Sequence, residues 1–243
     1  MLKSRGIVVR TVKYGETSVI ADIFTEEKGL RTFIAGGVRA AKTRMPFGLF
    51  QPMTIVELVS YFRETETDKG MNRLKEVRAA EIFTGIPFDM RRGAVTLLMA
   101  EVCRKCIHHS DEHRVLFEFL LDQLRWLDTT PHPVANIHLH FLIHLSGHLG
   151  FQPLAEPDNT GIFLDLKEGV YTATPPLHPC YLDAEQTQHW ASLLYVPLEL
   201  CHEINLTRTE RKALLQKLLI FYRTHVPGFT EIHTPDVLEM VLG

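Results

Sequence analysis

Residues 6–39 have the sequence GIVVRTVKYGETSVIADIFTEEKGLRTFIAGGVR, and this stretch decides the fold. Residues 7–12 alternate between two sets of side chains, which is the period-2 pattern of a strand with two distinct faces. Residues 18–25 are rich in β-branched side chains and predict a second strand. Gly29 supplies the positive φ that a tight connection to a third strand over residues 30–35 needs. The pattern therefore predicts three consecutive strands at the start of the chain.

Two further strands follow a basic, proline-containing loop over residues 38–52. Residues 53–62 alternate again between two sets of side chains, and a short strand is expected near residues 74–77. Five short strands within roughly 80 residues are typical of a small closed barrel, and the oligonucleotide-binding (OB) type is the usual barrel of that size. We therefore expect an OB-type five-stranded β-barrel over residues 1–80.

The rest of the chain has helical periodicity, which puts the domain boundary between residues 70 and 85. Thr207 and Glu210 have the spacing of a capping box and mark one helix start. Prolines and glycines punctuate residues 150–182, so we expect an irregular insert there. The predicted fold class is α+β: the barrel, followed by a mainly α-helical domain over residues 81–243 that contains the insert. Helices are predicted over residues 89–109, 112–128, 133–149 and 207–225, with shorter ones at 184–194 and 197–203.

The charge of the chain is divided unevenly. The 243 residues have a net charge of −3, which by itself argues against a nucleic-acid partner. Residues 1–80, however, hold 14 Lys and Arg against 9 Asp and Glu, a balance of +5, whereas residues 81–243 have a balance of −8. Such asymmetry indicates a nucleic-acid-binding segment joined to another domain, although differences of this size also arise from solubility alone.

Membrane and secretion signals are not found in the sequence. No stretch approaches the ~18 consecutive apolar residues that span a bilayer, and the first residues lack the apolar core of a signal peptide. Four cysteines without the spacing of a disulfide framework are typical of a reduced protein. We therefore expect a cytoplasmic protein with no membrane partner.

The strongest candidate for a binding site is the basic loop after Gly36 and Gly37. Lys and Arg pair with phosphates, and the glycines allow a close approach of the backbone. Arg31 and Phe33 share one strand face, where a cation beside a stacking ring suits a single-stranded nucleic acid. The opposite interpretation, with Phe33 in the barrel core and the loop charges merely solvated, stays open. The predicted contacts are Arg39, Lys42 and Arg44 in the loop, with Arg10, Arg31 and Phe33 on the strands.

Two groups of side chains resemble metal sites but lack complete ligand sets. Cys103 and Cys106 have the spacing of half a zinc site without a second pair, and buried free thiols are the favoured interpretation. His140, His144 and His148 share a helix face without a carboxylate near them in sequence, which favours a packing face. The sequence has no nucleophile, phosphate-loop or dinucleotide-binding motif, so we expect neither a metal, nor a cofactor, nor an enzyme.

Two more basic groups lie in the acidic half of the chain. Arg91-Arg92 with Arg104-Lys105 form the first, and Arg208, Arg211 and Lys212 on the last long predicted helix form the second. Because they are interleaved with apolar residues, they could form a groove for an acidic peptide. Such charges are more often the solvated side of an amphipathic helix, and both interpretations stay open.

The order and spacing of these segments resemble the bacterial RecO family, the recombination mediators of DNA repair. The resemblance is specific over residues 1–80 and looser beyond residue 90. It is carried by Ile7-Val8-Val9-Arg10, Tyr14-Gly15-Glu16-Thr17-Ser18, Phe24-Thr25 with Gly29, Gly36-Gly37-Val38-Arg39 with Lys42 and Arg44, Gln51-Pro52, and Leu149-Gly150-Phe151-Gln152-Pro153.

The resemblance implies an N-terminal OB domain and a C-terminal helical domain that bind single- and double-stranded DNA and anneal complementary strands. It also implies that the protein works with RecR, and that the two together help RecA to displace single-strand-binding protein. The acidic, hydrophobic C-terminal tail of that protein would dock on the helical domain, at residues that the resemblance does not assign. By position, the DNA-binding loop of the family corresponds to Arg39, Lys42 and Arg44. A nucleoid-associated location in the cytoplasm follows.

One departure from the family concerns zinc. Many members carry a four-cysteine zinc site in the insert, but residues 150–182 contain only Cys180. We therefore predict that apolar packing holds the insert in place of a metal. A protein-interaction adaptor and an RNA-binding OB protein without a recombination role are the alternative functions.

Overall fold

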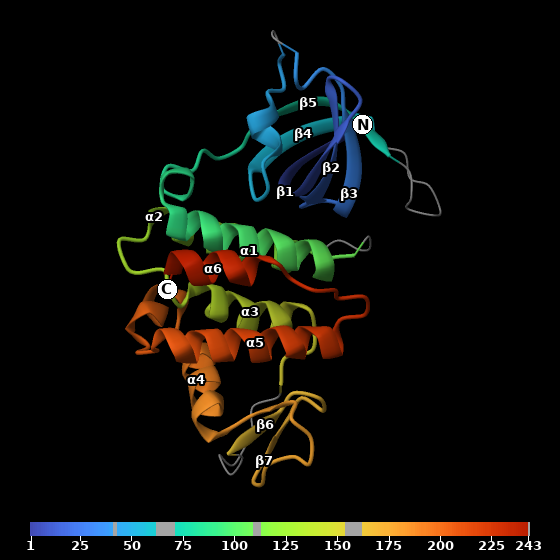
Figure 1. The fold of residues 1–243 in the computed structure, drawn as a ribbon. Coiled ribbons are helices and arrows are strands. Elements are labelled where there is room, and N and C mark those ends of the chain that lie inside the picture. Colours follow the sequence, from blue (N-terminus) through green and yellow to red (C-terminus); the bar gives the residue numbers. More distant parts are fainter. Residues whose placement is uncertain (41–42, 62–70, 109–112, 154–161, 243) are drawn as a thin grey trace. The chain divides into compact units, whose positions relative to one another are not determined.

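The structure is a computed structural model that describes residues 1–40, 43–61, 71–108, 113–153 and 162–242 (Figure 1). Its N-terminal part is a closed barrel with the strand order β1-β2-β3-β5-β4. β3 and β5 pair in parallel, and the other neighbours pair antiparallel. This arrangement confirms the OB-type barrel. The strands are β1 (Leu2–Tyr14), β2 (Ser18–Thr25), β3 (Gly29–Ala35), β4 (Ile55–Tyr61) and β5 (Asn72–Ala79).

Strand β1 closes the barrel because it pairs with a strand on each side. Residues 2–7 pair with β4, and residues 6–14 pair with β2. A register shift between Val8 and Arg10 marks an irregularity of the kind that bends a strand and increases its twist. Gly6 lies where the two ladders overlap, and its backbone comes close to the buried side chains of the core.

The connection between β3 and β4 completes the barrel core. Val38 and Phe50 are at most 1% exposed and belong to the same apolar cluster as the inward-facing strand residues. Phe50 ends the short 3-10 helix η1 (Phe47–Phe50). After η1, the backbone N–H of Met53 donates to the carbonyl of Val8 at 2.6 Å. The loop is therefore anchored near both of its ends.

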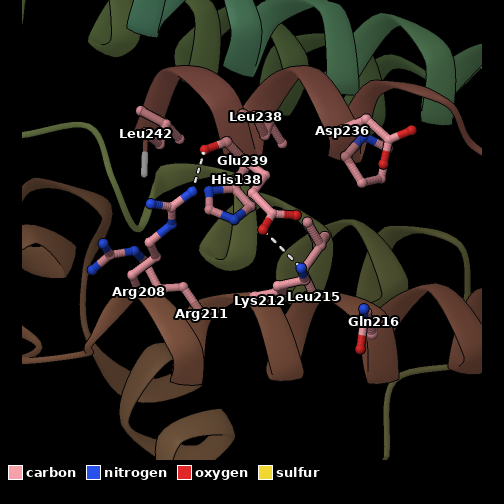
Figure 2. Close-up of a pocket in the computed structure, with 11 residues that line it drawn as sticks. His138, Arg208, Arg211, Lys212, Leu215, Gln216, Asp236, Leu238, Glu239 and Leu242 are labelled. Atoms are coloured by element: carbon pink, nitrogen blue, oxygen red, sulfur yellow. Dashed lines mark hydrogen bonds and ion pairs between the residues drawn. The ribbon is translucent and has the colours of Figure 1, made fainter.

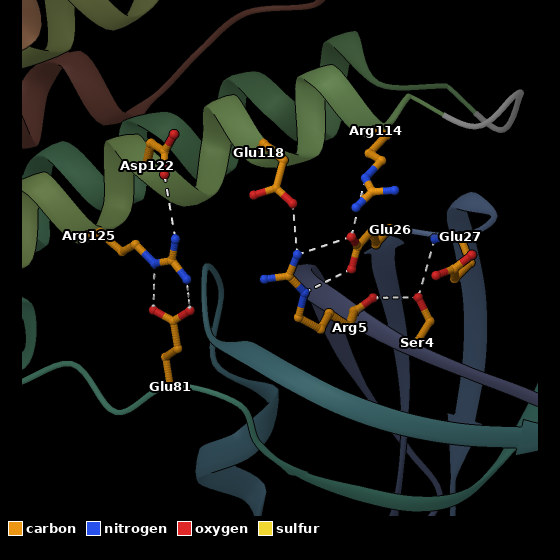
Figure 3. Close-up of polar contacts among 9 residues, drawn as sticks. All are labelled: Ser4, Arg5, Glu26, Glu27, Glu81, Arg114, Glu118, Asp122 and Arg125. Carbon is orange, nitrogen blue, oxygen red and sulfur yellow. Dashed lines mark hydrogen bonds and ion pairs between the residues drawn. The ribbon is translucent and has the colours of Figure 1, made fainter.

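A helix packs on the barrel within the first compact unit, which comprises residues 1–84 and 100–128. The ring of Phe117, on α2 (Arg114–Thr129), lies 6.0 Å from the ring of Phe24 between centroids. Arg5 of β1 reaches the Glu118 carboxylate at 2.7 Å and the Glu26 carboxylate at 2.8 Å (Figure 3). The hydrogen bond from Arg5 holds the pKa of Glu26 below its usual value. Apolar contact and a charge network together fix α2 against the barrel.

The second compact unit comprises residues 85–99 and 129–243 and is mainly helical, as predicted. The chain also forms α1 (Met90–Cys106), which the two units share. The other helices of the second unit are η2 (Ile86–Phe88), α3 (Ile137–His148), α4 (Ala184–Tyr195), η3 (Leu198–Glu203), α5 (Arg208–His225) and α6 (Thr234–Leu242).

Helix α3 is the centre of this unit. Nine of its residues are buried, because its sequence is apolar on nearly all sides. The hydroxyl of Tyr222 on α5 donates to the carbonyl of Leu142 on α3 at 2.7 Å. Helix α5 begins at the predicted capping box, in which the Thr207 side chain accepts from the Glu210 N–H and the Glu210 side chain accepts from the Thr207 N–H.

The insert contains a small sheet with the strand order β7-β6-β8. Its strands are β6 (Phe163–Asp165), β7 (Val170–Thr172) and β8 (Tyr181–Leu182). Leu164, Leu166 and Leu182 are at most 1% exposed, which agrees with the expected apolar packing. Residues 154–161 of the insert lie outside the described residues.

Gly6 gives a direct test of the barrel core. A Cβ atom at this position would lie 2.5 Å from Cγ2 of Ile23 and 3.2 Å from Cδ2 of Leu58, both in buried side chains. Because Ile23 is β-branched and stiff, Gly6→Ala should lower the free energy of unfolding by about 1–3 kcal/mol. Urea unfolding measures this loss. Gly48→Ala is the control, since a Cβ there meets nothing within 4 Å, and equal stability of the two variants would contradict the packing.

Candidate nucleic-acid interface

One end of the barrel carries an open groove of ≈ 1130 Å³. Its walls come from the β1–β2 turn, the end of β3, the end of β4 and the start of β5. Tyr61 is 53% exposed, and Arg73 and Lys75 are exposed cations. The groove thus combines an aromatic ring with positive charge, which is the combination that holds single-stranded nucleic acids. Residues that line it include Thr17, Gly36, Gly37, Tyr61, Arg73 and Lys75.

The basic loop begins at the edge of this groove. Gly37 has φ 70°, a left-handed conformation that glycine adopts without strain. The next residue, Val38, is 1% exposed and fixes the loop to the core. Arg39 is exposed, and its backbone N–H donates to the carbonyl of Thr17 at 3.1 Å. The loop therefore presents the Arg39 side chain to solvent beside the β1–β2 turn.

Of the other two predicted loop cations, only Arg44 is among the described residues. Arg44 is exposed and follows the same loop toward η1. Lys42 lies outside the described residues.

Arg10 and Arg31, predicted from strand geometry, are both engaged with the barrel. Arg10 is half-exposed, with Nη1 3.6 Å from the Asp22 carboxylate on the neighbouring strand. Arg31 is half-buried, and its Nη1 donates to the carbonyl of Leu30 at 2.9 Å. An anion would have to compete with these contacts, so both are secondary candidates beside Arg39.

Phe33 is not a stacking residue in this structure. Its side chain is 0% exposed and belongs to the apolar core of the barrel. Because Phe33 and Ala35 point into the barrel, the face that the alternation pattern offered for stacking is the inner one. The structure thus favours the alternative interpretation for Phe33, and Tyr61 takes its place as the aromatic candidate.

The sequence pattern did not single out Tyr61, Arg73 or Lys75. Tyr61 ends an alternating segment, where position alone does not reveal whether the ring is covered. Arg73 and Lys75 alternate with the buried Asn72 and Leu74 on β5, which places both cations on the outer face. This alternation is visible in the sequence and could have indicated two exposed cations. It does not show that they lie beside the groove, because that depends on how the strands pair.

A second cationic groove, with a cavity of ≈ 180 Å³, lies between α5 and α6 (Figure 2). The predicted basic group of Arg208, Arg211 and Lys212 lines it, together with the apolar Leu215 and Leu238. The three cations of α5 therefore face a partly apolar cavity, whose α6 side carries the carboxylates Asp236 and Glu239.

Of the α3 histidines, His138 and His140 are buried, His144 is half-buried and His148 is exposed, so only part of the predicted face is a packing face. His140 and His144 have ring centroids 4.1 Å apart, and His140 Nε2 lies 3.1 Å from the carbonyl of Val196. Burial lowers the pKa of His138 to about 3 and that of His140 to about 4. Both rings are therefore neutral at physiological pH, as members of a core are.

The cysteines and one further cluster bear on the metal question. Cys103 and Cys106 are buried free thiols, as predicted, and burial raises the pKa of both. Among the described residues, Glu185, His189 and Glu210 place one possible ligand atom each within 4.8 Å of one another. The Glu210 carboxylate already accepts from its capping-box partner, and we assign no metal to this group.

No helix in the described part of the chain has the length and apolar character to cross a membrane. The closed barrel and its groove instead define the class: an OB-fold protein of the nucleic-acid-binding kind, joined to a helical domain. The comparison with protein families gives the particular member of this class. Residues 1–83 match the family described as "Recombination protein O N terminal", and residues 87–231 match "Recombination protein O C terminal". The chain belongs to the RecO family.

Relatives of known name cover the whole chain. The chain is 32% identical to the DNA repair protein RecO of Bacteroides fragilis over 98% of this chain and 97% of the relative. It is 30% identical to the DNA repair protein RecO of Flavobacterium psychrophilum over 100% and 99%, respectively. The family is one of recombination mediators in DNA repair, and the names of these relatives give no enzymatic activity.

The buried histidines predict how stability depends on pH. In the unfolded chain a histidine binds a proton near pH 6.5, whereas His140 in the folded chain does so near pH 4. The unfolded state therefore binds more protons between these values, and stability falls as pH falls through this window. His140→Gln should make the slope shallower by up to about 1.4 kcal/mol per pH unit. Urea unfolding at several pH values between about 7 and about 4.5 measures the slope.

The control for this experiment is the exposed His108, changed in the same way. His108→Gln should keep the slope of the wild-type chain. If His140→Gln and His108→Gln have the same pH dependence, His140 is not the buried neutral group that the structure indicates.

Proposed function

We propose that the chain is a recombination mediator that binds single-stranded DNA in the groove at the end of its barrel. The observation that carries the proposal is the groove itself, where exposed Tyr61 lies with Arg73 and Lys75, and Arg39 follows on the adjoining loop. Phosphates pair with the cations, and a base stacks on the tyrosine ring, which contributes roughly 1–3 kcal/mol.

The remaining predicted residues extend this site. Arg44 and Lys42 continue the basic loop, Lys42 by its place in the sequence alone, and Arg10 and Arg31 assist from the strands. Contacts to phosphates and to the faces of bases carry little sequence information. Binding should therefore be general for single strands and weaker for duplex DNA, in which the bases are stacked. Sequence-independent binding of this kind suits the annealing of complementary strands.

The finer roles follow from membership of the family rather than from the groove. We propose that the chain works with RecR, and through it helps RecA to displace single-strand-binding protein on DNA in the nucleoid. The division of labour would be a DNA-binding domain over residues 1–80 and a partner-binding domain over residues 81–243. The balances of +5 and −8 in these two segments support that division.

The groove between α5 and α6 is the proposed site for the C-terminal tail of single-strand-binding protein. An acidic tail needs cations, which Arg208, Arg211 and Lys212 provide. Its apolar residues need a desolvated surface, and Leu215 on α5 is 6% exposed beside those cations. Charge and apolar character thus complement a peptide of this composition.

The DNA site is tested by titration of fluorescent single-stranded DNA at several salt concentrations. Changing Arg39, Lys42 and Arg44 together to Glu should weaken binding at least about tenfold, because phosphate contacts dominate affinity. The slope of log K against log salt should become shallower by about 0.7 for each phosphate that is no longer bound. Tyr61→Ala should weaken binding about tenfold with little change in that slope, since stacking is not ionic.

A matched control separates local contacts from net charge. Arg104, Lys167 and Arg223 are exposed cations outside the barrel, and changing them to Glu alters the net charge by the same amount. This control should bind DNA nearly as the wild-type chain does. Equal weakening in both triple variants would contradict the groove, and tight binding of RNA alone would instead support the RNA-binding alternative. A chain that binds RecR but no oligonucleotide would be an adaptor.

The tail site is tested with a peptide that has several Asp residues, then apolar residues and a free C-terminal carboxylate. Arg208→Glu with Lys212→Glu should weaken peptide binding at least about tenfold, because opposite charges across the contact become like charges. Fluorescence anisotropy measures the dissociation constant. Lys167→Glu with Arg223→Glu is the matched control and should leave it unchanged. Equal affinity of the two double variants would place the tail elsewhere.

A further inference from the structure

Helix α6 has the composition of the ligand that the cationic groove is proposed to bind. Its nine residues, TPDVLEMVL, contain two carboxylates, no cation and five large apolar side chains. The match to the C-terminal family description ends at residue 231, so α6 follows the part of the chain that this description covers. The structure therefore places an acidic, apolar segment of the chain itself after the matched region.

Contacts of α6 engage the same cations that an acidic peptide would need. Lys212 Nζ lies 2.7 Å from the Glu239 carboxylate, and Arg208 Nη2 donates to the Glu239 carbonyl at 3.1 Å (Figure 2). The ion pair with Lys212 holds the pKa of Glu239 below its usual value. Leu238, one residue earlier, is 3% exposed and supplies the apolar part of the contact. Helix α6 thus uses charge and burial together, as an incoming tail would.

The ion pair that holds α6 is partly exposed to solvent. The side chains of Lys212 and Glu239 are 50% and 40% exposed, and exposed ion pairs add little to stability. Met240 is 78% exposed. A helix of nine residues has little stability of its own and depends on such contacts.

The groove also contains a buried histidine. His138 is 3% exposed and lines the groove, where Figure 2 shows its ring between the α5 cations and Glu239. Its Nδ1 atom is buried and has no hydrogen-bond partner among the described residues. A buried polar atom of this kind is costly unless a ligand satisfies it.

We propose that α6 is a built-in competitor that covers the cationic groove and is displaced by an acidic, apolar peptide. This inference rests on the proposed function of the groove. The peptide binds only the fraction of molecules in which α6 has moved away, so the apparent dissociation constant is the intrinsic one divided by that fraction. Weakening the α6 contact raises the fraction and tightens binding. Release of α6 from α5 therefore accompanies binding of the peptide in the groove.

The test measures binding of the same acidic, apolar peptide to the full chain and to three variants. Glu239→Gln removes the ion pair with Lys212 and should tighten binding about threefold, as the small value of an exposed pair implies. Removal of residues 234–243 should tighten it at least about tenfold. Glu168→Gln, at an exposed carboxylate of the β6–β7 turn, has the same charge change as Glu239→Gln and should leave affinity unchanged.

A second measurement does not depend on the truncated chain folding. Hydrogen exchange of the wild-type chain should show that the α6 amides become less protected when the peptide binds, while the α5 amides do not. This fall in protection supports displacement.

The two hypotheses fail in different ways. Equal affinity of the wild-type chain and Glu239→Gln, or α6 amides that become more protected, would overturn the competitor while leaving the groove as the tail site. If the peptide binds neither the wild-type chain nor any variant, including Glu239→Gln and the truncated chain, the result would overturn the tail site as well.

Discussion

The closure of the barrel through β1 is the constraint on which the binding groove depends. Residues 2–7 bond to β4 and residues 6–14 bond to β2, so one strand satisfies the backbone groups of both edges. Closure fixes where β3, β4 and β5 end relative to one another. Those ends, with the β1–β2 turn, make the walls of the groove. Gly6 is part of this constraint because any larger residue would push β1 away from the core.

The loop between β3 and β4 serves the core and the binding surface at once. Val38 and Phe50 are buried in the barrel, while Arg39 and Arg44 between them are exposed. Burial of Val38 holds the backbone next to Arg39, and the side chains of Arg39 and Arg44 are available at the surface.

The sequence predicts the elements of this fold better than it predicts which way they face. The strand over residues 18–25 is found with the same bounds, and the capping box of Thr207 correctly marks the start of α5. The alternation of β3 shows that Phe33 shares a face with Arg31. It does not show which face of the strand points into the barrel, because the barrel has an inside only after β1 closes it. Tyr61 and α6 were not found for the same reason: their roles depend on neighbours distant in sequence.

The two cationic surfaces differ in how much of their charge is available. On the barrel, the charges of Arg39, Arg73 and Lys75 face solvent and act over the ~10 Å of a Debye length, so they attract a polyanion before contact. On α5, Glu239 already neutralises Lys212, whereas Arg208 and Arg211 donate to backbone carbonyls and keep their charge. A partner there must also gain by burying apolar side chains beside Leu215.

If the two proposed sites hold DNA and an acidic tail, selection between these ligands needs no specific rejection of DNA. The phosphate backbone has no apolar side chains to bury in the α5 groove, and a short acidic tail has fewer negative charges than DNA to pair with the barrel. The acidic balance of residues 81–243 would add to this separation, because repulsion acts more strongly on DNA, with its many phosphates, than on a short acidic tail.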